Sequence, residues 1–189
     1  NADAVYLIGD MTDWTEKKAF ALEKTGTDGV WEIHLPSEKL DHRNLYRLRV
    51  HWPDGMGDRI PAYARRVVQD PDTLIFNAQV WRPPEPYRWK NNNSHHLSEP
   101  PLIYEAHVGM AQEKEGVGTY REFADHLVPR IRAAGYNTIQ LMAVQEHPYY
   151  GSFGYHVSNF FAASSRFGTP EELKELIDEA HGHGMAVIM

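Results

Sequence analysis

The chain has 189 residues, 42% hydrophobic and 24% charged, a composition typical of a globular protein with one large domain or two small ones. Its 26 acidic and 19 basic residues give a net charge of −7, which repels a phosphate backbone, and no basic patch offsets it, so no nucleic-acid partner is expected. No apolar run approaches the roughly 20 residues that cross a bilayer, and we expect no membrane partner. Cysteine is absent, which excludes disulfides and thiolate metal sites. The lack of cysteine fits a protein of the reducing cytoplasm, but it does not exclude an exported protein.

The first eighty residues contain short, partly alternating apolar runs separated by turn clusters, of which "TDGV" and "PDGMGD" are the clearest. This rhythm predicts an all-β, immunoglobulin-like antiparallel sandwich over residues 1–81. The predicted strands lie within "VYLIGD", "AFALEKT", "GVWEIHL", "LYRLRVHW", "RRVVQD" and "LIFNAQVW". Trp14, Trp31 and Trp52 offer a carbohydrate-binding platform, but for any single one of them a place in the sandwich core is the favoured interpretation.

Residues 82–101 differ in composition from the chain on either side. They carry five prolines and a run of asparagines. Proline lacks an N–H group and therefore prevents both a regular helix and an inner strand. The segment is predicted to be a linker that packs along a surface.

From residue 102 the pattern predicts alternating strands and helices, and hence a parallel sheet. "LIYEAHVG", "NTIQLMAV" and "MAVIM" are the expected strands. Thr119 with Glu122, and Thr169 with Glu172, form capping boxes ahead of the two expected helices. The apolar stripes of these helices are Phe123, Leu127, Ile131 and Ala134 in the first, and Leu173, Leu176, Ile177 and Ala180 in the second. Pro129 should kink the first helix or open one of its hydrogen bonds, and Gly135 can end it.

A long aromatic loop, "QEHPYYGSFGYHVSNFF", follows the second of these expected strands. In parallel α/β folds the loops at the carboxyl ends of strands carry the functional groups. A sugar ring packs its C–H face on an aromatic ring, and Tyr155 is the best candidate for such a platform. The alternative, that the rings only form a satellite cluster beneath a long loop, is about equally favoured by the spacing.

Glu105 and Glu146 lie on or just after the first two expected strands. Neighbouring strands are about 4.8 Å apart, close to the roughly 5 Å that separates the two carboxyl groups of a retaining glycosidase. A catalytic pair is therefore possible, although a glutamate near a strand end more often braces backbone or an arginine. His147 either orients a substrate hydroxyl or is a hydrogen-bonded structural histidine.

The eleven histidines do not predict a metal site. His181 and His183 are two positions apart near a helix end, where such residues do not share a face. His95 and His96 lie in the linker without a third ligand. The chain also lacks the G-x-S-x-G and G-x-x-x-x-G-K motifs, so neither a serine nucleophile nor a phosphate loop is expected.

Taken in order, several stretches resemble the starch- and glycogen-branching enzymes of the α-amylase superfamily, particularly the eukaryotic type. They are "VYLIGDMTDW", "GVWEIHLP", "IYEAHVG" and everything from "GYNTIQLMAVQEHPYYGSFGYHV" to the final "MAVIM". The similarity covers nearly the whole chain and is most specific over residues 135–189. It implies a sandwich followed by a (β/α)8 TIM barrel, of which residues 102–189 would supply the first three strands and two helices.

The resemblance also implies an activity and its residues. A branching enzyme cleaves an α-1,4 link by a two-step retaining displacement and transfers the chain to a 6-hydroxyl, in glycogen or starch synthesis, without a cofactor. The family's nucleophilic aspartate and acid/base glutamate would lie beyond Met189, so no catalytic residue is expected here, neither Glu105 nor Glu146. Tyr155 matches the family tyrosine that stacks on the sugar at the cleavage point. His156 stands where the family often has glutamine, while Glu146 and His147 would support the cleft.

Two other functions stay open on the sequence alone. One is an α-glucan hydrolase of the amylase or debranching type, and the other is a non-catalytic glycan-binding module in which Trp14 and Trp31 contact the polysaccharide. The substrate in every case is an α-glucan such as glycogen, starch or amylose. Three barrel strands by themselves would leave an unpaired edge and an uncovered apolar face, which predicts self-association of the isolated piece.

Overall fold

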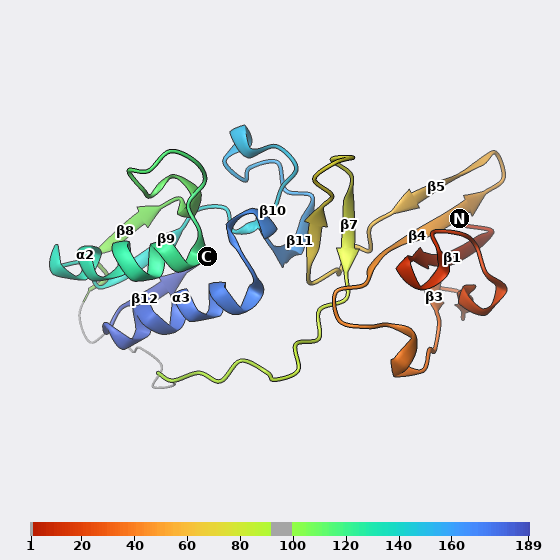
Figure 1. The fold of residues 1–189 in the computed structure, drawn as a ribbon, viewed down its shortest axis with the longest axis horizontal. Coiled ribbons are helices and arrows are strands. Elements are labelled where there is room, and N and C mark those ends of the chain that lie inside the picture. The colour runs from red at the N-terminus through yellow and green to blue at the C-terminus, as the bar shows by residue number, and fades with distance from the viewer. Residues whose placement is uncertain (1, 92–99) are drawn as a thin grey trace. The chain divides into compact units, whose positions relative to one another are not determined.

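The computed structural model describes residues 2–91 and 100–189, which form two compact units, Asn1–Pro84 and Glu85–Met189 (Figure 1). Within the described residues, no helix is both long enough and apolar enough to cross a membrane. His95 and His96 lie outside the described residues, as does the middle of the predicted linker. Each unit has its own sheet and its own core, so each is described separately.

The first unit is built on a five-stranded sheet in which β4 pairs antiparallel with β1, β5 and β7, and β6 pairs antiparallel with β7. A separate antiparallel pair, β2 with β3, precedes β4 in the chain. All six predicted apolar runs contain a strand. The strands are β1 (Ala4–Gly9), β2 (Glu23–Thr25), β3 (Val30–Glu32), β4 (Leu45–Trp52), β5 (Gly55–Arg59), β6 (Val67–Gln69) and β7 (Phe76–Gln79), and short 3-10 turns lie at Asp10–Thr12, Lys18–Phe20 and Ser37–Lys39.

The segment "PDGMGD", predicted as a turn, is mostly a strand. Strand β5 begins at Gly55, pairs with β4 from Trp52 onward, and leaves only Pro53 and Asp54 to make the turn. Its glycines lie beneath the Trp52 ring, because a Cβ added to Gly57 would come within 3.1 Å of that ring. Glycine here makes room for an aromatic side chain within a hairpin, a role that composition alone does not distinguish from a turn.

The core of the first unit is aliphatic rather than aromatic. Its fully buried members are Ile8, Val67 and Ala78, with Val5, Leu7, Phe20, Ala64 and Val80 nearly so. Trp14, Trp31 and Trp52 are only half-buried, so the expectation that they lie in the core is wrong. Two of them instead stack with arginines at the surface, Trp14 over Arg47 at 5.6 Å and Trp52 over Arg59 at 5.8 Å.

The second unit contains the predicted parallel sheet, with its strands side by side in chain order (Figure 1). The strands are β8 (Ile103–Ala106), β9 (Thr138–Leu141) and β12 (Ala186–Ile188). Ile139 on the central strand β9 lies between Tyr104 and Val187 and is fully buried. The central position of β9 explains why its sequence is a nearly continuous apolar run.

The first helical segment begins at the predicted capping box. The Thr119 hydroxyl accepts a bond from the N–H of Glu122, whose carboxylate accepts one from the Thr119 N–H at 3.0 Å. The expected effect of Pro129 appears as a π-turn, Phe123–Leu127, between α1 (Tyr120–Glu122) and α2 (Val128–Ala133). A widened turn avoids the clash between a proline ring and the carbonyl one turn earlier.

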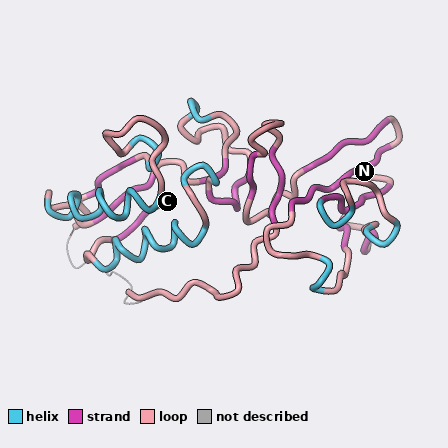
Figure 2. The backbone as a smooth tube through the Cα atoms, in the orientation of Figure 1, coloured by secondary structure: helices cyan, strands magenta, loops and turns pink. Residues whose placement is uncertain are grey.

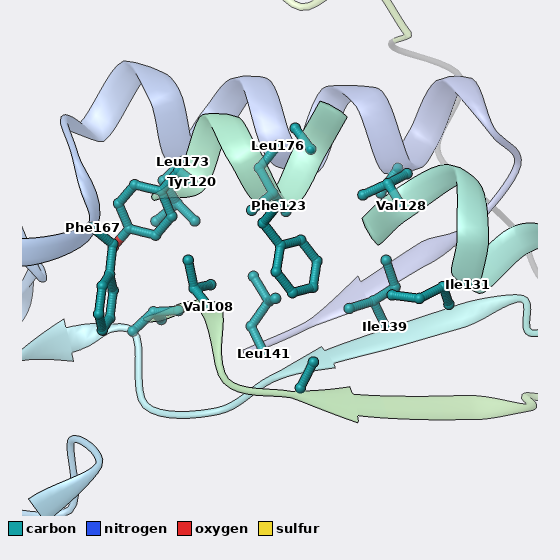
Figure 3. Packing of buried hydrophobic residues seen from close by; sticks show 14 of the residues in the cluster. Val108, Tyr120, Phe123, Val128, Ile131, Ile139, Leu141, Phe167, Leu173 and Leu176 are labelled. Carbon is teal, nitrogen blue, oxygen red and sulfur yellow. The ribbon is translucent and has the colours of Figure 1, made fainter. Parts of the chain in front are cut away.

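Helix α3 (Pro170–Gly182) begins at the second predicted capping box, at Thr169. It lies beside the first helical segment on one side of the sheet, with the core packed between helices and strands (Figure 3). Most of the predicted stripe residues belong to this core, among them Phe123, Ile131, Leu173, Leu176 and Ala180. Ala134 does not belong to it and is exposed, because the helix ends one residue before it.

The remaining elements lie in the segments after β8 and after β9. A two-stranded antiparallel ribbon consists of β10 (Gln145–Glu146) and β11 (Asn159–Ala163), and short 3-10 turns lie at Val108–Met110, Tyr150–Ser152 and Ser165–Phe167. Residues 80–91 run without helix or strand after β7, as Figure 2 shows. Their last part, from Glu85 onward, belongs to the second compact unit.

Candidate functional site

The candidate site is formed by the segments that leave the carboxyl ends of β8 and β9. His107 follows β8 directly, and the chain after β9 leads through β10 into the aromatic loop of residues 147–158. The loop is closed at its base, because the N–H and hydroxyl of Ser158 donate to the Glu146 carbonyl at 2.9 and 3.1 Å. The loop is therefore a tied structure on the edge where parallel α/β folds carry their functional groups.

Glu146 lies inside this base and not on its surface. Its side chain is only 1% exposed, and its carboxylate accepts the N–H of Ser165 at 2.7 Å and that of His147 at 3.2 Å. Burial raises the pKa of Glu146, and these backbone donors oppose that rise only in part. Through its hydrogen bond from Ser165, the buried Glu146 carboxylate connects the base of the loop to the turn Ser165–Phe167, which precedes α3.

His147 and His107 are buried beneath the surface of the site, and both rings contact the Phe167 ring. The His147 ring is fully buried and its Nδ1 is 3.0 Å from the Gln145 carbonyl, while its Nε2 has no partner. His107 is 7% exposed, both of its ring nitrogens are unpartnered, and its ring meets the Phe167 ring edge-on at 5.4 Å. Burial, with repulsion from His147, lowers the pKa of His107, so the ring stays neutral near pH 7.

The aromatic loop and the neighbouring strand also carry exposed aromatic rings. Tyr155 is 72% exposed, Tyr149 is 65% exposed and Phe153 is 40% exposed. Phe160 and Phe161 on the neighbouring strand β11 are also exposed. The Tyr155 ring is thus open to solvent and not wedged into the interior, as a sugar-stacking role requires.

The backbone that presents Tyr155 is held by a close approach. Gly154 has φ +82°, and a Cβ added to it would lie 2.2 Å from the Ala143 Cβ and 2.9 Å from the Ala143 carbonyl oxygen. Ala143 and Phe153 themselves occupy the left-handed region, at φ 45° and 51°. Non-glycine residues in this region are strained and tend to cluster at functional sites.

Glu105 and Glu146 have separate partners and no contact with each other. Glu105 is exposed on β8 and accepts a hydrogen bond from the Gln140 amide at 2.7 Å, across the pair of parallel strands. Glu146 lies in the ribbon, not in this sheet, and is directed at Ser165. Glu146 therefore braces backbone, as the alternative for a glutamate near a strand end predicted, whereas the partner of Glu105 is a side-chain amide and neither backbone nor an arginine.

Three residues that sequence reasoning did not single out complete the site: His107, Tyr150 and Arg166. Arg166 lies 5.8 Å from the Tyr150 ring centre and donates to the Pro148 carbonyl at 3.1 Å. His107 contacts the Tyr150 ring at 6.0 Å. His107 lies in the last part of the predicted strand "LIYEAHVG", and this place near a carboxyl end was a signal for it, whereas Arg166 approaches the loop only through the fold.

The remaining histidines have separate surroundings. His156 is exposed beside Tyr155, His181 contacts the Trp89 ring, and His183 pairs with Glu179 one turn earlier on α3 at 3.3 Å. Over residues 2–91 and 100–189, no three acidic or histidine side chains are grouped closely enough to hold a metal ion.

In the first unit, Trp14 presents a half-buried ring at the end of a tight turn. Both Asp13 and Trp14 have positive φ, 53° and 58°, and the Trp14 N–H donates to the Gly9 carbonyl at 3.0 Å. Trp31 lies on β3 in the separate two-stranded sheet. A partly exposed aromatic ring is suited to carbohydrate stacking.

Two family descriptions match the chain. "Carbohydrate-binding module 48 (Isoamylase N-terminal domain)" matches residues 1–71, and "Alpha amylase, catalytic domain" matches residues 89–189, more than half of the chain.

Individual proteins are also similar over the whole chain. A "1,4-alpha-glucan-branching enzyme" of Rhizophagus irregularis is 46% identical over 100% of this chain and 28% of its own length. A "1,4-alpha-glucan-branching enzyme 2-2, chloroplastic/amyloplastic" of Arabidopsis thaliana is 45% identical over 100% of this chain and 24% of its own. Among solved structures, a pullulanase from Bacillus acidopullulyticus superposes with a TM-score of 0.76 at 19% identity, over 98% of this chain and 26% of that one. This chain thus spans about a quarter of the length of these relatives.

Proposed function

Because the chain belongs to the α-amylase family, we propose that it is the amino-terminal part of a 1,4-α-glucan branching enzyme. The enzyme cleaves an α-1,4 link in glycogen, starch or amylose and transfers the released chain to a 6-hydroxyl. The identity of 45–46% to proteins named as branching enzymes supports this activity. The match of residues 1–71 to a carbohydrate-binding module supports an α-glucan as the substrate.

The proposal includes the finer architecture. The antiparallel strands of residues 1–81 form an immunoglobulin-like sandwich, and residues 102–189 form the first three strands and two helices of a (β/α)8 barrel. The chain order of β8, β9 and β12 in a parallel sheet, with helices over one face, supports the barrel. The two antiparallel sheets of the first unit support the sandwich.

The chemistry is a double displacement at the anomeric carbon. A carboxylate attacks the carbon while a carboxylic acid protonates the leaving oxygen, and the 6-hydroxyl of a second glucan then displaces the carboxylate. We place both carboxyl groups after Met189, so the piece described here is inactive by itself. Its contribution is to bind and orient the glucan and to exclude water, which would otherwise intercept the glycosyl-enzyme.

Tyr155 carries the site proposal. Its ring is 72% exposed on a loop tied at its base by Ser158 and Glu146, at the carboxyl ends of parallel strands. We propose that this ring stacks on the sugar at the cleavage point and that the neighbouring His156 reaches a sugar hydroxyl. Glu146 and His147 act from beneath, by holding the loop.

The test of this function uses the full-length protein with amylose as substrate. We expect α-1,6 linkages to accumulate while few reducing ends appear, because each cleaved chain is transferred and not released. Reducing ends that rise in step with bond cleavage would identify the alternative, an α-glucan hydrolase of the amylase or debranching type. Glucan binding without bond cleavage would leave only a glycan-binding module. The isolated 189-residue chain should show neither cleavage nor transfer.

A further inference from the structure

A hollow of about 330 Å³ lies within the first unit and is lined by residues of that unit. Its volume is in the range of small-molecule sites, roughly 300–1,000 Å³. Part of its lining is aliphatic, from Leu7 and Val80. The side chains with a recognition chemistry are Tyr46, Tyr63, Trp81, Arg65, Gln79 and Arg82.

We propose that this hollow, the Tyr63 pocket, binds a segment of an α-glucan as a contact separate from Trp14 and Trp31. The inference rests on the proposed α-glucan substrate and adds a second place where the first unit holds it. The lining combines aromatic rings with guanidinium and amide donors and contains no acidic side chain. A glucosyl unit needs this combination, since its C–H face packs on a ring while its hydroxyl oxygens accept hydrogen bonds.

Tyr63 provides the most exposed ring of the pocket. It is 77% exposed, the highest value among the exposed large hydrophobic side chains of the described chain. Tyr46, by contrast, is half-buried, and burial raises the pKa of its hydroxyl, which stays protonated. The pocket therefore has one ring at its mouth and one in its wall.

Trp81 is fixed in position without a ligand. Its ring lies 4.8 Å from the His42 ring, and the Arg66 guanidinium lies 5.1 Å from the Trp81 ring centre. The His42 Nδ1 in turn accepts the N–H of Arg82 at 3.0 Å. A wall that is ordered before binding loses little conformational entropy when a ligand arrives.

Two guanidinium groups of the pocket are uncommitted. In the part of the chain that the structure describes, Arg65 and Arg82 form no ion pair, whereas Arg47 and Arg49 on β4 both pair with Asp58. Each guanidinium carries five N–H donors, and a polyhydroxylated ligand offers many acceptors for them. These two arginines are positioned to bind sugar hydroxyls and are not used to stabilise the sheet.

The Tyr63 pocket and the Trp14 contact use different side chains of β4. Tyr46, which lines the pocket, and Arg47, which lies over the Trp14 ring, are consecutive residues of that strand. Successive side chains of a strand point to opposite faces. The two contacts are therefore proposed as separate places on the first unit.

The experiment compares Tyr63→Ala with Tyr63→Trp in the full-length protein, by titration with maltoheptaose and by retention in a glycogen-containing gel. We expect Tyr63→Ala to weaken binding about fivefold and Tyr63→Trp to retain it, since stacking is worth on the order of 0.5–1.5 kcal/mol. Arg65→Ala combined with Arg82→Ala should weaken binding in the same way. Leu74→Ala is the matched control, because Leu74 is 65% exposed in the same unit and outside the pocket.

The outcomes separate this proposal from the proposed function. Unchanged maltoheptaose binding in Tyr63→Ala, with normal branching of amylose, would overturn the pocket and leave the function standing. A fivefold loss in Tyr63→Ala that persists in a Trp14→Ala background would support two separate contacts. A loss of thermal stability in Tyr63→Ala without a loss of binding would also overturn the proposal. If the parent protein formed no α-1,6 linkages, the result would contradict the proposed branching activity and not the Tyr63 pocket.

Discussion

Asn91 makes three hydrogen bonds to Asp178, which lies 87 positions later in the chain. Its N–H donates to the Asp178 carboxylate at 2.9 Å, and its side-chain amide donates to that carboxylate at 3.1 Å and to the Asp178 carbonyl at 3.0 Å. The Tyr87 hydroxyl and the Lys90 N–H reach the same carboxylate, both at 2.8 Å. Asp178 thus holds the segment Tyr87–Asn91 against helix α3.

Replacing Asp178 should destabilise the second unit. The carboxylate is 2% exposed and satisfies several donors at once, so Asp178→Ala leaves buried N–H and O–H groups without partners. We expect a loss of about 2–4 kcal/mol in the free energy of unfolding, measured with urea, and about 1 kcal/mol for Tyr87→Phe. Glu179→Ala, on the exposed side of the same helix turn, is the control and should cost little. Equal effects of Asp178→Ala and Glu179→Ala would show that the segment is not held there.

Glu146 and Asp178 should give pH dependences of opposite sign. Burial raises the pKa of Glu146, so the folded state binds the carboxyl proton of Glu146 more tightly than the unfolded state does. The stabilisation that comes from this proton is therefore lost as pH rises through the folded-state pKa. Burial alone would raise the pKa of Asp178, but the groups that donate hydrogen bonds to its carboxylate lower the pKa overall. The stabilisation that comes from the ionised Asp178 is therefore lost as pH falls through the lowered pKa. The free energy of unfolding should be measured between about pH 3 and pH 7. Its decrease with rising pH should be smaller in Glu146→Gln than in the parent, and its decrease with falling pH should be smaller in Asp178→Asn. Identical changes in the two variants would contradict this assignment.

Gly154→Ala should displace the ring of Tyr155 without unfolding the protein. The added Cβ would meet Ala143 at 2.2 Å, in a backbone conformation that already disfavours a side chain. We expect kcat/KM of the full-length protein on amylose to fall about tenfold or more, since a small misplacement of a binding group is costly. Gly116→Ala is the matched control, because Gly116 has φ +114° and nothing within 4 Å of the added Cβ. Activity that falls equally in both variants would point to general strain and not to Tyr155.

Tyr155→Ala should lower kcat/KM on amylose by about tenfold, and Tyr155→Phe by less, because the stacking face is kept in the second variant. Tyr149→Ala is the comparison within the same loop, since Tyr149 is 65% exposed. We expect Tyr149→Ala to stay close to the parent. The stacking role would be wrong if Tyr155→Ala retained full activity, or if Tyr149→Ala lost as much.

Trp14→Ala and Trp31→Ala should reduce the retardation of the full-length protein in a glycogen-containing gel. The Arg47 guanidinium lies 5.6 Å from the centre of the half-buried Trp14 ring, whereas the Trp52 ring packs on the glycines of its own hairpin. Trp52→Ala is therefore the control for loss of a tryptophan. Unchanged migration of Trp14→Ala and Trp31→Ala would remove both rings from the glycan contact.

Local sequence determined the elements of this protein. The two capping boxes, the six strand-bearing runs of the first unit and the three parallel strands were all predictable, because helix starts and strand periodicity depend on residues a few positions apart. The position of Tyr155 on an exposed loop after the second parallel strand was predictable for the same reason. The "PDGMGD" segment was predicted wrongly, since glycine favours a turn and equally allows a strand to pass beneath a tryptophan ring.

The tertiary structure alone decided which side chains meet. Nothing in the sequence near Asp178 indicates that its carboxylate binds Asn91, and nothing near His107 indicates that its ring packs on Phe167. Glu146 is a charged residue at the end of a short strand, yet the fold buries it and turns it into the tie of a loop base. Such contacts join residues many positions apart, and only packing of the whole unit brings them within hydrogen-bonding distance. For this reason the sequence predicted the exposed loop that carries Tyr155, and the fold determined which groups hold that loop in place.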